Sequence, residues 1–165
     1  MQAQRRADSL ARIEQKKQEA LMAENNRIKN LFTSGDFKAQ QVETGDTIYF
    51  FPSPVTIYKN RDNVYIPQPN RAFSSIISRY FDRNQQTELV IYGAYDPQTE
   101  NLNNDSLGVA RAQFLKNRLV RSGINPDRIS TKAISKTLNF DNKGRNYEGL
   151  QLEFRNYTKE RASQV

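Results

Sequence analysis

The segment ELVIYGAYD (residues 88–96), followed by PQTENLNNDS (97–106) and LGVARAQFLKNRLVRSGINPDRI (107–129), decides the fold of this chain. Its first residues form a nearly continuous apolar run, which is typical of a central strand inside a sheet. Residues 106–121 carry apolar side chains at helical spacing, and Gly123 suits the end of a helix because glycine adopts a left-handed conformation easily. The segment therefore predicts a strand, a loop and a helix in that order.

The flanking segments predict the rest of one domain. Residues 71–85 place apolar side chains three and four positions apart, which indicates an amphipathic helix. TIYFFPSPVTIYKN (47–60) predicts a strand, a kink at two prolines and a second extended piece. RISTKAIS (128–135) and GLQLEFRNY (149–157) predict two further strands, separated by a loop over 136–149. The order β-α-β-α-β-β predicts an α+β sandwich with two helices on one face of a small mixed sheet.

The ends of the chain differ from this domain in composition. We expect residues 1–45 to be a polar helical stalk and linker, residues 46–157 to be the domain, and residues 158–165 to be a disordered tail. Residues 4–33 lack glycine and proline, which predicts one long helix. Its apolar stripe is interrupted by Lys17 and Glu24, so a solvated stalk, a weak coiled coil and the remainder of a membrane-anchored stem all stay open.

Composition excludes several classes of chemistry. The chain has no cysteine and no histidine, which removes disulfides, thiolate metal sites and triads that use histidine as the base. No glycine-rich phosphate loop is present. We therefore expect no enzyme activity, no catalytic residue, no metal and no cofactor. The net charge of +7 is concentrated between Val109 and Lys136, which indicates either a basic face for a polyanion or a solvated helix face.

Asp96 and Arg111 are the leading candidates for a binding site. Asp96 follows the predicted central strand, and Arg111 lies near the start of the helix after it. A carboxylate can accept the ammonium of an amino-acid group, and a guanidinium can hold its carboxylate with two parallel bonds. Each residue also has a simpler interpretation: Asp96 as the residue that closes a turn before Pro97, and Arg111 as a solvated helix charge.

The spacing of these residues resembles a known family. GAYD, a polar loop with two adjacent asparagines, L-G-x-x-R-A, a helix that ends S-G-I, and P-D-R-I before a strand resemble the OmpA-like peptidoglycan-binding domain, which includes Pal- and MotB-like members. The family pattern is G-H-T-D, then L-S-x-x-R-A, then G-I-x-x-x-R-I. The resemblance covers roughly residues 46–155, and it implies the OmpA-like fold.

The resemblance also implies a ligand, the diaminopimelate group of the peptidoglycan stem peptide. Asp96 would bind its ammonium and Arg111 its carboxylate. The remaining site residues implied are Asn104, Leu107, Gly108 and Arg145. The function implied is non-catalytic anchoring of an envelope protein to the cell wall. We expect a periplasmic location and a tether to the inner or outer membrane by a segment outside this chain. We also expect envelope partners that bind through the N-terminal helix, and no nucleic-acid ligand.

Departures from the family pattern support an alternative. Ala94 and Tyr95 replace the His-Thr pair, Gly108 replaces the usual serine, and an expected N-R-R run near Arg145 is absent. A site that loses part of its cationic wall holds a carboxylate less tightly. The alternative hypothesis is a degenerate OmpA-like scaffold that serves protein–protein interaction in an envelope assembly and has lost peptidoglycan binding.

Overall fold

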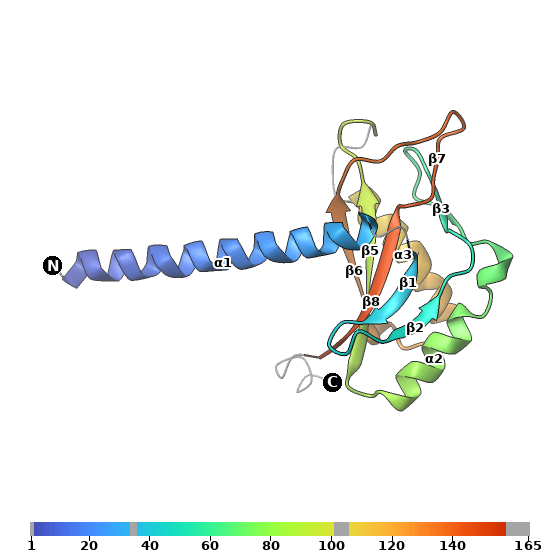
Figure 1. Ribbon diagram of the computed structural model, residues 1–165, viewed down its shortest axis with the longest axis horizontal. Coiled ribbons are helices and arrows are strands. Elements are labelled where there is room, and N and C mark those ends of the chain that lie inside the picture. The colour runs from blue at the N-terminus through green and yellow to red at the C-terminus, as the bar shows by residue number, and fades with distance from the viewer. Residues whose placement is uncertain (1, 34–35, 101–105, 158–165) are drawn as a thin grey trace. The chain divides into compact units, whose positions relative to one another are not determined.

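The computed structural model describes residues 2–33, 36–100 and 106–157 (Figure 1). The chain divides into two compact units. Helix α1 (Gln2–Thr33) forms the first, as its lack of glycine and proline predicts, and all other elements belong to the second. The second unit includes residues 36–45, which the sequence analysis assigned to the linker. The predicted tail, residues 158–165, lies outside the described residues.

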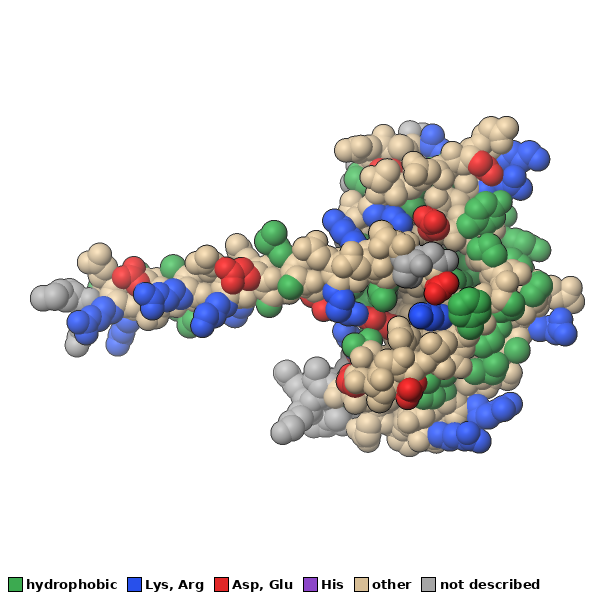
Figure 2. Space-filling view, in the orientation of Figure 1, with side chains coloured by type: hydrophobic (Ala, Val, Ile, Leu, Met, Phe, Trp, Pro, Cys, Tyr) green, Lys and Arg blue, Asp and Glu red, His purple; other side chains and the backbone are tan. Residues whose placement is uncertain are grey.

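Polar and charged side chains dominate the surface of α1 (Figure 2). In the parts of the chain that the structure describes, no helix combines the length and the apolar character needed to cross a membrane.

A mixed five-stranded sheet forms the centre of the second unit. Its strand order is β2 (Thr47–Phe50), β1 (Lys38–Gln41), β8 (Leu150–Asn156), β5 (Thr87–Tyr95) and β6 (Ile129–Ser135). β5 pairs with β6 in parallel and with β8 antiparallel, so that Ile91 faces Thr131 on one side and Leu152 on the other. β1 runs parallel to β8, and β2 is antiparallel to β1.

Helices α2 (Phe73–Arg83) and α3 (Ser106–Arg121) pack on one face of this sheet (Figure 1). From α2, the rings of Tyr80 and Phe81 lie 4.5 and 5.3 Å from the ring of Phe154 on β8. From α3, Leu115 and Leu119 are fully buried. Burial of these side chains is the main force that holds the layers together. The predicted α+β fold, with two helices on one face of a mixed sheet, is confirmed.

A second, three-stranded sheet stands beside the first. It consists of β4 (Val64–Tyr65), β3 (Thr56–Tyr58) and β7 (Arg145–Asn146), with Tyr58 paired to Arg145. The 3-10 turns η1 (Gln68–Asn70) and η2 (Pro126–Arg128) complete the described elements. β7 lies where the sequence predicts a loop, because two residues carry no readable periodicity.

The basic run between residues 109 and 136 is not one continuous binding face. Arg128 donates to the carbonyls of Phe81, Asn84 and Thr87, and its guanidinium lies 4.2 Å from the centre of the Phe81 ring. Arg111 is completely buried. Two of the charges that the sequence assigns to a face therefore hold the fold together.

Candidate functional site

Asp96 follows the last residue of β5, and its carboxylate is used within the chain. Oδ1 accepts from the backbone N–H of Gln98 at 3.0 Å, and Oδ2 accepts from the backbone N–H of Leu138 at 2.9 Å. The first bond closes a turn, in agreement with the simpler interpretation of Asp96. The second bond ties the segment after β6 to the end of β5. Asp96 is buried, so neither bond is replaced by water.

The charge state of Asp96 fits this structural role. Burial alone raises the pKa of the carboxyl group, but the N–H groups of Leu138 and Gln98 and the bonds from Thr99 favour the ionised form. The net result is a pKa below its ordinary value. Asp96 is therefore a carboxylate whose charge is compensated by backbone dipoles.

Arg111 lies in the second turn of α3, and its side chain is fully buried. A guanidinium has five N–H donors, and all five are satisfied here. Nε donates to the carbonyl of Arg61 at 3.1 Å. Nη1 donates to the carbonyl of Ala94 at 2.9 Å and to Glu100 Oε1 at 3.0 Å. Nη2 donates to the carbonyl of Tyr58 at 2.9 Å and to Glu100 Oε2 at 2.5 Å. No donor of Arg111 is left for a ligand.

Glu100 is the partner that the sequence did not reveal. Its two carboxylate oxygens accept two parallel bonds from Arg111. A ligand carboxylate was expected to bind Arg111 in this same arrangement. Oε1 also accepts from the N–H of Asp96 at 3.0 Å, and Oε2 from the N–H of Asn60 at 2.9 Å. Burial raises the pKa of Glu100, but the bonds from Arg111, Asn60 and Asp96 outweigh it and lower the pKa overall.

The turn from Asp96 to Glu100 explains how this carboxylate reaches Arg111. The N–H of Glu100 donates to the carbonyl of Asp96 at 2.9 Å, which closes a single helical turn at the end of β5. A carboxylate four residues after the candidate aspartate is the only signal in the sequence, and it is too common to single out Glu100. The predicted opening between Asp96 and Arg111 is therefore filled by a side chain of the same chain.

The remaining predicted site residues are scattered. Gly108 is buried against β5: a Cβ on it would lie 2.5 Å from the carbonyl oxygen of Gly93, so close packing and not a ligand explains this glycine. Arg145, on β7, is half-exposed and pairs with Asp141 at 3.0 Å. That ion pair and its hydrogen bond raise the pKa of Arg145. Asn104 lies outside the described residues.

An open pocket of about 460 Å³ lies beside the start of α3. Leu107, a predicted site residue, lines it, and neither Asp96 nor Arg111 does. Arg61 and Asp62 bring one charge of each sign to its lining. The full lining is Asn60, Arg61, Asp62, Asn63, Ser106, Leu107 and Ala110.

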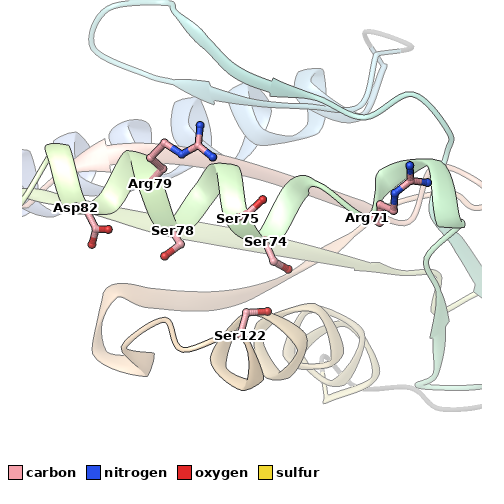
Figure 3. Close-up of a pocket in the computed structure, with 7 residues that line it drawn as sticks. All are labelled: Arg71, Ser74, Ser75, Ser78, Arg79, Asp82 and Ser122. Carbon is pink, nitrogen blue, oxygen red and sulfur yellow. The ribbon is translucent and has the colours of Figure 1, made fainter.

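A second pocket, of about 490 Å³, lies between α2 and the end of α3 (Figure 3). Ser74, Ser78 and Asp82 point from α2 toward Ser122. The hydroxyl of Ser122, just after α3, donates to the carbonyl of Arg118, and a carbonyl is not a base that could activate it. Among the described residues no group of three acidic, histidine or cysteine side chains could hold a metal ion.

No family model matches this sequence, and no curated protein does. Among solved structures, the chain is similar to the peptidoglycan-associated lipoprotein of Burkholderia pseudomallei, with 17% identity over 60% of this chain and 88% of that chain and a TM-score of 0.46. It is also similar to the periplasmic domain of Helicobacter pylori MotB, with 14% identity over 78% and 91% of the two chains and a TM-score of 0.45.

A third similar structure is the OmpA-like domain of FopA1 from Francisella tularensis, with 14% identity over 76% of this chain and 92% of that chain and a TM-score of 0.42. These values describe a general likeness of fold and are too low to transfer a ligand.

Proposed function

We propose that this chain is a non-enzymatic scaffold of the bacterial cell envelope, which uses an OmpA-like fold for protein contact and has lost peptidoglycan binding through Asp96 and Arg111. The observation that carries the proposal is the occupancy of Arg111, whose five donors are all accepted within the chain. A ligand carboxylate would have to displace Glu100 from a fully buried pair, and breaking such a pair is strongly unfavourable.

Exposed aromatic side chains on the outer strands support a role in protein contact. Phe50 on β2, Tyr65 on β4 and Tyr147 after β7 are all exposed. β2 and β4 are each the last strand of a sheet, so their outer edges have no neighbouring strand in the described chain. Aromatic residues are enriched where proteins meet, because they bury a large area at little entropic cost. We propose a periplasmic location for this scaffold.

Co-sedimentation with purified sacculi tests the proposal. The wild-type chain, kept full length, should remain in the supernatant at near-physiological salt. Saturable retention of the wild-type chain would contradict the proposal. Alanine substitution of Asp96 or Arg111 is not an informative test, because both side chains hold the fold together.

Binding of peptidoglycan through the diaminopimelate group is the second candidate. The pocket beside Leu107 favours it, because Arg61 and Asp62 together offer the two charges that a zwitterionic amino-acid group requires. If this candidate is correct, the wild-type chain co-sediments, and Asp62→Asn lowers retention without lowering the melting temperature. Asp82→Asn, at an exposed aspartate of α2 outside this pocket, is the matched control.

A further inference from the structure

Helix α1 exposes apolar side chains that need a partner. Leu10 and Leu21 are 66% and 61% exposed, and α1 forms a unit by itself. Most of the stability of a helix in a protein comes from packing its apolar face, so a second surface that covers these leucines would stabilise α1. Figure 2 shows hydrophobic side chains among charged ones along α1.

The exposed leucines belong to a seam along one side of α1, whereas Ile13 and Met22, which are also exposed, lie off it. Its members follow one another by alternating steps of four and three residues, the spacing at which side chains line a helix–helix contact. Near the middle of the seam stand one acidic and one basic residue, with a leucine on either side of them. The seam consists of Ala3, Ala7, Leu10, Glu14, Lys17, Leu21 and Glu24.

The charges in the seam select the direction of the partner. A parallel pair in register would place Glu14 against Glu14 and Lys17 against Lys17, and like charges repel. An antiparallel pair with its axis between Gln15 and Lys16 places Glu14 against Lys17 twice. The same axis places Leu10 against Leu21 twice. One alignment therefore matches the four central positions, Leu10, Glu14, Lys17 and Leu21, and it sets Ala7 against Glu24 at either side of them.

Neighbouring antiparallel alignments lose this match. Moving the axis so that Lys17 faces Leu21 brings Glu14 opposite Glu24, which places two carboxylates together and sets a charge against a leucine. Specificity in helix pairs arises in this way, from unfavourable charges in the alternative alignments.

We propose that α1 binds α1 of a second copy of this chain in antiparallel orientation, with the axis between Gln15 and Lys16. The residues that the contact requires at its centre, Leu10, Glu14, Lys17 and Leu21, are all exposed. The inference uses α1 alone and stands whether the globular unit is a scaffold or a peptidoglycan-binding domain.

Distances between spin labels on the full chain test the orientation. The chain has no native cysteine, so Gln4→Cys and Gln18→Cys each give one labelled position per copy. Both glutamines are exposed and lie off the seam. With a rise of about 1.5 Å per residue, labels at position 4 should be roughly 35 Å apart along an antiparallel pair, and labels at position 18 roughly 8 Å apart along it. A parallel pair brings both positions close together, and that result would overturn the proposal.

Charge substitutions test the alignment through the dimerisation constant measured by analytical ultracentrifugation. Glu14→Lys should weaken self-association about tenfold, because two ion pairs become two repulsive contacts. Adding Lys17→Glu should restore it. Glu19→Lys, which makes the same change in net charge on the opposite side of the helix, should have little effect. A chain that stays monomeric at ~0.1 mM, or equal effects of Glu14→Lys and Glu19→Lys, would refute the proposal.

Discussion

Removal of the Glu100 carboxylate is the sharpest test of how Arg111 is used. In Glu100→Ala, the buried guanidinium of Arg111 loses both bonds that it donates to the carboxylate, and the N–H groups of Asp96 and Asn60 lose their acceptors. Removing one partner of a buried ion pair costs about 3–5 kcal/mol, because the other charge is left without compensation. A domain of this size is stable by about 5–15 kcal/mol, so the loss is a large fraction of the total.

The assay is thermal and urea denaturation of the full chain, followed by circular dichroism. At about 4 °C per kcal/mol, Glu100→Ala should lower the melting temperature by roughly 12–20 °C. Glu100→Gln keeps the shape of the side chain but loses its charge, so it should cost less than the alanine variant. Glu148→Ala, at an exposed glutamate, is the matched control and should change stability little.

A small carboxylate should partly repair the alanine variant. Acetate can occupy the space that Glu100 leaves beside Arg111, and a ligand that binds only the folded state raises the melting temperature. Acetate should therefore stabilise Glu100→Ala more than chloride does at the same ionic strength, and it should not stabilise the wild type. If the melting temperature of Glu100→Ala stays within about 2 °C of the wild type, the pair is not structural and the reasoning fails.

Three further outcomes follow from the same contacts. The folded pKa values of Asp96 and Glu100 lie below their ordinary values. The stability they add is therefore complete above about pH 5 and is lost as the pH falls through the folded pKa values, which acid titration of urea unfolding will detect. Gly108→Ser introduces the serine of the OmpA-like pattern. It should lower the free energy of unfolding, measured with urea, by about 3 kcal/mol or more, because the serine Cβ would overlap the Gly93 carbonyl. Arg128→Ala should lower the free energy of unfolding by about 2–4 kcal/mol, because it removes bonds to three backbone carbonyls and the contact with the Phe81 ring. A melting temperature equal to that of the wild type would contradict a stabilising role for Arg128.

The larger helices and strands could be predicted from the sequence because each carries its own periodic pattern. The apolar run of β5 and the helical spacing of α3 are local signals that need no knowledge of the rest of the chain. β1 shows the limit of such reasoning. Its four residues, KAQQ, have no strand propensity, and they form a strand because Ala39 pairs with Leu152 at the other end of the chain. Strand formation there depends on a partner that local sequence cannot reveal.

Only part of the candidate site could be predicted from local sequence patterns. The sequence identified Arg111 as a special position, and the structure places it at the meeting point of β5, α3 and the turn after β3. Its partner, Glu100, could not be chosen from the sequence, because the turn that brings it to Arg111 depends on a backbone bond to Asp96. The spacing of two charges shows that they lie near each other, but it does not show whether the space between them is empty.

Gly108 links the packing of the domain to the fate of Arg111. The carbonyl of Gly108 lies so close to β5 that a Cβ on Gly93 would be only 1.8 Å from it, so α3 approaches the strand more closely than side chains at these positions would allow. Arg111 lies one turn further along α3, and its Nη1 reaches the carbonyl of Ala94 next to Gly93. A serine at position 108 would push the helix outward and draw Arg111 away from that carbonyl. Close packing of α3 on β5 through Gly93 and Gly108 therefore helps to hold Arg111 within the core.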